Sequence, residues 1–187
     1  MRLAKAKART RGSKIIASLA VSIDGYIAAP GGSCDWLEPY SDSLAGLAAF
    51  YRTIGANVMG RGTYDFLLRH PEGAGMFGSK PLYILSHRAL PALPGVEPIL
   101  FSGNVRTLAS RLKAKMKKHI WLLGGGRTLR AFLEADLIDR WQLHVVPVVL
   151  GSGIPFLPKL GFRVRDMSLI RTKSYPSGVV ELCYKRA

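Results

Sequence analysis

The stretch that most constrains the fold of this chain is residues 119–136, which read HIWLLGGGRTLRAFLEAD. The apolar run Ile120–Leu123 is followed by three glycines, Gly124, Gly125 and Gly126, and then by apolar residues that recur at helical spacing. This order predicts a strand, a glycine turn and a helix. Glycines let the backbone approach a ligand closely, and free N–H groups at a helix N-terminus attract anions such as phosphate. Because the motif is not GxGxxG, a tight turn that binds nothing remains an equal alternative.

Length and composition indicate a single folded domain. The chain has 187 residues, 48% of them hydrophobic, and no apolar run reaches the ~18 residues of a membrane span. Its basic N-terminus lacks the apolar core of a signal peptide. The two cysteines, Cys34 and Cys183, are too few for a disulfide framework and lack metal-ligand spacing. We therefore expect a cytoplasmic protein without a metal site.

The formal net charge of +15 suggests a polyanionic partner as one possibility. Residues 1–13 are predicted to form a disordered basic leader, and 14–187 a single domain. A second basic cluster consists of Arg106, Arg111, Lys113, Lys115, Lys117 and Lys118. Nucleic-acid binding is the alternative function that this charge supports, but no helix-turn-helix, zinc-finger or RNA-binding motif accompanies it. A solvated tail and helix face explain the same charge.

Strand and helix patterns alternate along the chain. Strands are predicted at Ile15–Val21, Tyr26–Ala28, Ala56–Met59, Pro81–Leu85, Ile99–Phe101, Ile120–Leu123 and Arg140–Leu150, and in a hairpin of Asp166–Tyr175 and Val179–Lys185. Helices are predicted at Ser41–Ile54, from Thr63 to Leu68, from Asn104 to about Lys117, and after Gly126, while His70–Ser79 is predicted as a loop. The expected fold is α/β, with a mostly parallel central sheet and an antiparallel C-terminal hairpin at its edge.

Three turns that follow predicted strands share a composition suited to phosphate. They are Gly60–Thr63 (GRGT), Ser86–Arg88 (SHR) and Gly124–Thr128 (GGGRT), and each contains an arginine. Because the C-terminal ends of parallel strands line one edge of a sheet, these turns are expected to lie together. Guanidinium groups bind phosphate through paired hydrogen bonds. The three turns together predict a site for a polyanionic nucleotide.

With these three turns, the sequence resembles the dihydrofolate reductase-like family. In particular, it resembles bacterial proteins similar to the C-terminal reductase domain of the bifunctional riboflavin-biosynthesis deaminase/reductase. The resemblance rests on segments in family order, which are ASLAVSIDGYIA at Ala17–Ala28, NVMGRGTYDFL at Asn57–Leu67, PLYILSHR at Pro81–Arg88, IWLLGGGRTLRAFLEADLID at Ile120–Asp139 and VVPVVLGSGIPF at Val145–Phe156. It covers the chain from about Lys14 onward and implies a three-layer fold of that family.

The resemblance also implies NADPH as the reductant. It implies a cofactor site near the nicotinamide end at Ala17, Ser18 and Ile27, near the phosphates at Gly60, Arg61 and Thr63, near the 2′-phosphate at Ser86, His87 and Arg88, and along the pyrophosphate at Gly124, Gly125, Gly126, Arg127 and Thr128. A space-filling role for His87 is the stronger alternative. The implied activity is reduction of a small pterin- or aminopyrimidine-like heterocycle. The implied assembly is a homodimer that pairs through the sheet edge; the long strand at Trp141–Leu150 is compatible with such pairing, and its apolar residues fit a core position as well.

The substrate side of the site is less specific. Gly46 occupies the position where folate reductases carry a pterin-binding carboxylate, so folate itself is a doubtful substrate. Asp24 is the candidate proton donor or relay, although Asp24-Gly25 also fits a simple turn. Trp36, Asp42 and Tyr51 are the candidate substrate-binding residues, and Trp36 fits a core position equally well. A member of the family that binds cofactor but lacks activity is a further alternative.

Overall fold

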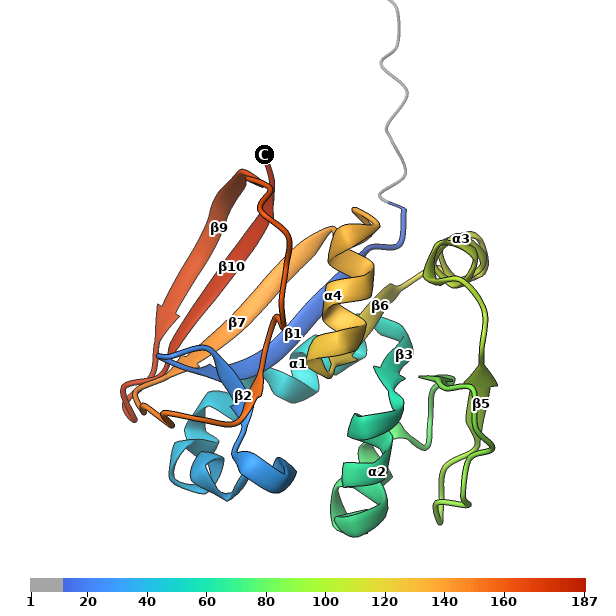
Figure 1. Ribbon diagram of the computed structural model, residues 1–187, viewed down its shortest axis with the longest axis horizontal. Helices are drawn as coiled ribbons and strands as arrows, with labels where there is room; N and C mark the ends of the chain where they lie inside the picture. The colour runs from blue at the N-terminus through green and yellow to red at the C-terminus, as the bar shows by residue number, and fades with distance from the viewer. Residues whose placement is uncertain (1–11) are drawn as a thin grey trace, which may run out of the picture.

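An eight-stranded sheet runs through the centre of the protein (Figure 1). The computed structural model describes residues 12–187, so the predicted leader, residues 1–13, lies outside the described residues except for its last two positions. Of these, Ser13 donates a hydrogen bond from Oγ to the carbonyl of Lys113 at 3.2 Å. The contact ties the end of the leader to the folded domain.

The sheet is parallel over most of its width. Its strand order is β5-β4-β3-β6-β1-β7-β10-β9. The strands are β1 (Ile15–Ser22), β3 (Ile54–Gly60), β4 (Leu82–Leu85), β5 (Pro98–Phe101), β6 (His119–Gly124), β7 (Arg140–Val146), β9 (Met167–Ser174) and β10 (Val180–Arg186). Every neighbouring pair from β5 to β7 is parallel, whereas β10 runs antiparallel to both β7 and β9. The predicted parallel sheet with an antiparallel hairpin at its edge is confirmed.

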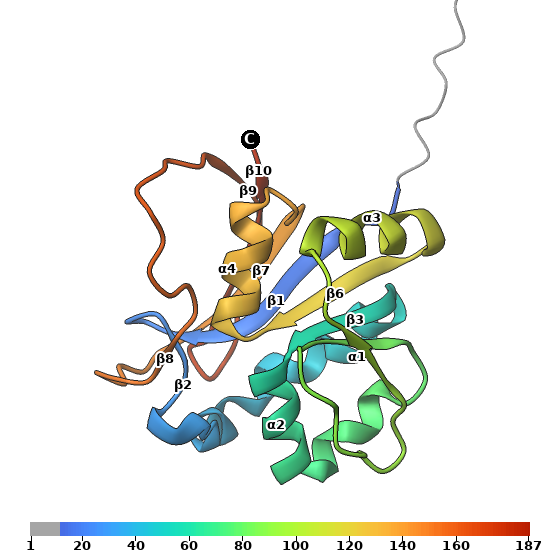
Figure 2. The same cartoon turned by 45° about the vertical axis from the view of Figure 1, so that its right-hand side comes forward.

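Helices cover both faces of this sheet. The helices are α1 (Leu47–Arg52), α2 (Arg61–Arg69), α3 (Val105–Lys115) and α4 (Gly126–Glu134), with 3-10 helices η1 (Pro30–Gly32), η2 (Asp35–Gly46) and η3 (Pro71–Phe77). A small second sheet pairs β2 (Tyr26–Ala28) with β8 (Ile154–Pro155). Helices α3 and α4 lie on one face, and α1 and α2 lie on the other (Figure 2). The result is the three-layer arrangement that the sequence predicts.

Side-chain alternation in the central strands divides the core between these layers. Ile15 of β1 packs with Leu129 and Phe132 of α4, all with no exposed surface. On the opposite face, Trp121 of β6 makes an edge-to-face contact with Phe50 of α1, with ring centroids 5.3 Å apart. Strands buried on both faces need apolar residues at successive positions, which explains the continuous apolar runs in the sequence.

The predicted helix at Ser41–Ile54 is wrong in its extent. The chain forms the 3-10 helix η2 over Asp35–Gly46, and only Leu47–Arg52 is α-helical, while Ile54 begins β3. Ser43 does not cap a helix, because its Oγ donates to the carbonyl of Tyr40 at 2.8 Å. Pro39 inside the segment lacks the N–H that a regular α-helix needs, and this favours the tighter 3-10 form.

Three other predictions about elements need correction. Helix α2 spans Arg61–Arg69 with Gly60 as its N-cap, so it begins two residues before the predicted start at Thr63. The predicted loop at residues 70–79 contains η3. Strand β7 ends at Val146, because Pro147 cannot donate to a strand partner.

Strand β7 also lies inside the sheet, between β1 and β10. It therefore has no free edge through which two copies could pair, and the argument for a homodimer from this strand is wrong. The free edges of the described sheet belong to β5 and β9. A homodimer stays a prediction.

Candidate functional site

The three predicted turns lie at one edge of the sheet. Strands β4, β3 and β6 are parallel neighbours, with Gly60 paired to Leu85 and Met59 paired to Gly124. The next strand in the order, β1, also ends here, at Ser22. We call this set of strand ends, with the turns that follow them, the carboxyl edge. In open α/β sheets, ligands bind outside the C-terminal ends of the strands.

Glycines allow close packing between two of these turns. A Cβ atom on Gly60 would collide with Oγ1 of Thr128, so the end of β3 lies directly against the first turn of α4. Gly124 has a φ of 119°, which residues other than glycine rarely adopt. The sequence therefore needs glycine at both positions to bring GRGT and GGGRT together.

Gly125 lies where α2 and β2 both approach the GGG turn. A Cβ atom built on Gly125 would lie 3.5 Å from Oγ1 of Thr63 and 3.6 Å from Cδ1 of Ile27. Thr63 belongs to α2 and Ile27 to β2, so residues implied at the phosphate and nicotinamide ends meet here. Ser18, by contrast, is 7% exposed and Ala17 is completely buried. Both residues belong to β1, one of the strands that end at the carboxyl edge.

Arg61 joins the first two turns. Its Nε donates to Oδ1 of Asp65 at 2.6 Å, and its Nη1 donates to the carbonyl of Ala89 at 2.9 Å. Ser86 Oγ accepts from the backbone N–H of Arg88 and donates to the carbonyl of the same residue, both at 3.0 Å. These bonds fix the Ser86–Ala89 turn beside the start of α2. His87 and Arg88 are exposed on its outer side.

The N-terminus of α4 faces the same edge. Its N-cap Gly125 has no side chain to satisfy the first N–H groups of the helix. Arg127 in the first turn is exposed, whereas Thr128 is buried. Free helical N–H groups together with an exposed guanidinium make a suitable environment for a phosphate group.

A fourth turn belongs to this edge and was missed by the sequence reasoning. It is the segment after β5, which begins at Ser102. The backbone N–H of Ser86 donates to the carbonyl of Phe101 at 3.1 Å, so this turn lies beside the Ser86–Arg88 turn. Asn104 ends it by capping α3, with its side chain accepting from the N–H of Arg106. The available signal was Ser-Gly-Asn directly after a predicted strand.

Asp24 stands at the end of β1, where the sequence places a proton donor. Its carboxylate accepts hydrogen bonds from Oγ of Ser22 at 2.6 Å and from the backbone N–H groups of Leu150 and Gly151. The Ser22 bond, with those from the two N–H groups, lowers the pKa of Asp24. A carboxylate held in its ionised form is suited to anchoring the 150–151 loop and poorly suited to donating a proton.

The three candidate substrate residues do not converge. Trp36 packs against Val146 and Tyr175 at the β7–β10 side of the sheet. Asp42 Oδ2 accepts from the backbone N–H of Ser177 at 3.0 Å in the same region, and this bonding lowers the pKa of Asp42.

Tyr51 packs against a different hydrophobic cluster, the one that contains Trp121. Its ring contacts Trp121, and its hydroxyl accepts from the side-chain amide of Asn57 at 3.3 Å. Asp42 and Tyr51 therefore lie against different parts of the same sheet face, rather than in one common cleft as the sequence suggests.

Neither a metal cluster nor a membrane-spanning helix is found in the part of the chain that the structure describes. No group of three or more His, Cys, Asp or Glu side chains within residues 12–187 has a geometry that could hold a metal ion. No helix in the same range is long and apolar enough to cross a bilayer.

Comparison with solved structures confirms the fold. A protein from Shewanella sp. PV-4, described as a candidate riboflavin biosynthesis protein, matches with a TM-score of 0.82 and 28% identity over 93% of this chain and 99% of that one. The Thermotoga maritima diaminohydroxyphosphoribosylaminopyrimidine deaminase/5-amino-6-(5-phosphoribosylamino)uracil reductase matches with a TM-score of 0.68 and 15% identity, over 94% of this chain and 57% of that one. Dihydrofolate reductase from Enterococcus faecalis, complexed with NADP(H), matches with a TM-score of 0.64 and 16% identity over 92% and 96% of the two chains.

The family follows from a sequence model. Residues 13–181 match the model of the RibD C-terminal domain, which is nearly the whole of the described chain. The match includes every strand end of the carboxyl edge. The chain therefore belongs to the RibD C-terminal domain family and has a dihydrofolate reductase-like fold.

Proposed function

We propose that this protein is an NADPH-dependent reductase of a small heterocycle of the pterin or 5-amino-6-(ribosylamino)uracil type. The observation that carries the proposal is the carboxyl edge, where four neighbouring strand ends bring the Gly60–Thr63, Ser86–Arg88 and Gly124–Thr128 turns together. A dinucleotide phosphate carries several negative charges along an extended chain. Several phosphate-binding turns in a row suit such a ligand better than a single-phosphate ligand.

The residues present fit NADPH in their chemistry. The phosphates would lie against the N-terminus of α4 and Arg127, and Arg88 is the exposed guanidinium for the 2′-phosphate. Arg61 keeps its charge partly balanced by Asp65, so we assign it to holding the turn as well as to attracting phosphate. Ser18 and Ile27 would border the nicotinamide end, from which NADPH supplies a hydride when bound.

Two relatives support the proposal in different ways. The reductase part of the Thermotoga maritima enzyme's description names a phosphoribosylaminouracil substrate, and the Enterococcus faecalis enzyme is complexed with NADP(H). Both are below 20% identical to this chain, so they support the chemistry only through the shared fold. The substrate of this protein is the part of the proposal that most needs an experiment.

Cofactor binding is the first test. NADPH titrated into the protein should quench tryptophan fluorescence saturably at micromolar concentration, since Trp121 lies in β6, next to the GGG turn. NADH should bind at least tenfold more weakly. Absence of saturable NADPH binding by the folded protein would refute the proposal.

Turnover is the second test. The protein should oxidise NADPH when a ribosylaminouracil or a dihydropterin is added. The loss of NADPH absorbance measures this reaction. Binding without turnover of either class would assign the protein to the inactive, cofactor-binding alternative. Salt-sensitive binding to DNA or RNA with no NADPH affinity would favour the nucleic-acid alternative.

A further inference from the structure

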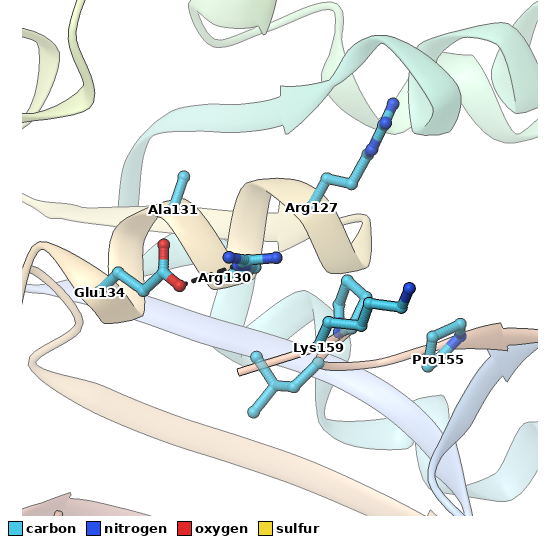
Figure 3. A pocket seen from close by; sticks show the side chains of 8 residues that line it. Arg127, Arg130, Ala131, Glu134, Pro155 and Lys159 are labelled. Carbon is cyan, nitrogen blue, oxygen red and sulfur yellow. Dashed lines mark hydrogen bonds and ion pairs between the residues drawn. The ribbon is translucent and has the colours of Figure 1, made fainter. Parts of the chain in front are cut away.

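A cavity of about 590 Å³, which we call the outer cavity, lies on the outer side of α4 and extends to Arg127 in the first turn of that helix (Figure 3). One wall is formed by α4, and the other by the segment that follows β8. Three cationic side chains line it, together with one carboxylate and a small apolar surface. The lining residues are Arg127, Arg130, Ala131, Glu134, Pro155, Leu157, Pro158 and Lys159.

The charges in this cavity do not cancel. Arg130 Nε donates to Oε1 of Glu134 at 2.8 Å, four residues further along the helix. That bond leaves the terminal nitrogens of Arg130 without a hydrogen-bond partner among residues 12–187. The ammonium of Lys159 and the guanidinium of Arg127 likewise have no ion-pair partner within the described range. Three cations therefore line the cavity with one carboxylate, and that carboxylate already pairs with Arg130.

Figure 3 shows how these cationic side chains are oriented. Arg130 and Glu134 lie along α4, and Lys159 extends from the opposite wall between Arg130 and Pro155. Arg127 points away from Lys159. Arg130 and Lys159 are therefore the pair that a ligand in this cavity would meet, and Arg127 is left to the carboxyl edge.

The walls are fixed in position. A Cβ atom on Gly126 would collide with the carbonyl of Pro155 and would lie 2.9 Å from Cδ of Pro158, so the start of α4 and the opposite wall are in tight contact. Lys159 has a φ of 39°, a left-handed conformation that residues with a side chain seldom adopt. Such conformations persist where the surrounding structure imposes them, and they concentrate at binding sites.

We propose that this cavity is a second anion site, which takes a small phosphorylated organic molecule such as a sugar phosphate. The phosphate contacts the guanidinium of Arg130 and the ammonium of Lys159. Its carbon framework lies on Pro155, Leu157 and Pro158. A guanidinium fork next to an ammonium suits phosphate geometry, and the cavity volume falls in the range of small-molecule sites.

The test measures binding to the full chain by isothermal titration calorimetry. The probe is ribose 5-phosphate, and ribose is the neutral comparison. Ribose 5-phosphate should bind and ribose should not. The double variant Arg130→Gln with Lys159→Asn should weaken binding at least tenfold, and asparagine is chosen because it tolerates the left-handed backbone. The matched control Arg106→Gln with Lys117→Gln removes the same charge from the other basic cluster and should bind as the parent does.

Three outcomes would overturn the proposal. They are equal binding by the cavity variant and the parent, equal weakening by the control variant, and loss of ribose 5-phosphate binding when the protein is saturated with NADP⁺. The first shows that the cavity is not the site, the second shows a general effect of charge, and the third makes the cavity part of the cofactor site. The proposal is thus separable from the proposed reductase activity, since it stands or falls without turnover.

Discussion

The two halves of the sheet hold their polar groups in opposite ways. At the carboxyl edge the polar groups are backbone N–H groups and exposed arginines, and the turns are brought together by glycines such as Gly60. At the other end of the sheet, which we call the hairpin end (β7, β10 and β9 with η2), the polar groups are side chains, and those around Glu181 bond one another. Glu181 of β10 is 3% exposed, and its carboxylate accepts from the Tyr175 hydroxyl at 3.1 Å.

A network of side chains at the hairpin end surrounds Glu181. Arg171 pairs with Glu181, and Sγ of Cys183 lies 3.2 Å from the same carboxylate. Burial acts to raise the pKa of Glu181, but the bonds from Cys183 and Tyr175 and the charge of Arg171 lower it overall. Burial lowers the pKa of His144, which lies opposite Glu181 on β7.

The difference lies in how the polar groups are held. At the hairpin end the groups around Glu181 bond one another and stabilise the fold. Other polar atoms of this end are buried without a hydrogen-bond partner among the described residues, and they include Trp36 Nε1, Asp42 Oδ1, His144 Nδ1 and Ser177 Oγ. The carboxyl edge leaves its donors directed outward and relies on close backbone packing to hold them. Four experiments test this difference between the two ends.

The largest effect is expected at the glycine packing. Gly126→Ala should destabilise the protein by about 1–3 kcal/mol, because the new methyl group would overlap Pro155 and Pro158. NADPH binding should be lost with it. Gly62→Ala is the control, since nothing lies within 4 Å of a Cβ atom there and alanine favours the helix. Urea denaturation measures both, and equal stability of the two variants would contradict the packing argument.

Glu181→Gln should cost about 1–2 kcal/mol of stability, because a charge-assisted network loses its charge. The figure is modest since the Arg171 side chain is 55% exposed and can return to solvent. Affinity for NADPH should not change. A variant that kept its stability but lost the cofactor would mean that the hairpin end belongs to the binding site.

Arg88→Gln should weaken NADPH binding about tenfold and leave NADH binding unchanged, because only the 2′-phosphate would meet this guanidinium. Lys117→Gln, an equal charge change just after α3, serves as the control. The ratio of the two affinities is read from fluorescence titrations. An equal loss for both cofactors would place Arg88 away from the 2′-phosphate.

The smallest effect is the dependence of stability on pH. The pKa values of Glu181, Asp24 and Asp42 are lowered in the folded state. Their contribution is therefore complete above the unfolded carboxyl pKa of about 4 and is lost as the pH falls through the lower folded values. Urea midpoints should decline below about pH 5, with a shallower decline in Glu181→Gln. Identical slopes in the two proteins would remove Glu181 from the effect.

Much of the carboxyl edge could be predicted from the sequence, and much of the hairpin end could not. The turns at Gly60, Ser86 and Gly124 have local signals, namely glycines and small residues after apolar runs. Parallel strands then bring their ends together without further information. Loop closure between distant segments leaves no such signal, and so the interior position of β7 was not predictable from its apolar pattern.

The same limit explains the substrate side. Trp36 and Asp42 belong to a 3-10 helix whose position depends on Ser177 in a turn 135 residues further along the chain. Tyr51 lies under Trp121, and no pattern within its own segment distinguishes that contact from one with a ligand. Residues 155–159, which form a wall of the outer cavity, likewise carry no pattern of their own that indicates a binding site.

The central position of β1 has a consequence for how the chain folds. This first strand pairs with β6 and β7, so Ile15 meets Ile120 and Ile16 meets Arg140. During synthesis the N-terminal strand emerges first, yet neither partner exists until most of the chain has been made. Contacts over such separations slow folding and leave apolar segments exposed in the interim. A nascent chain of this protein must therefore keep the Ile15–Ser22 strand from pairing wrongly until its neighbours arrive.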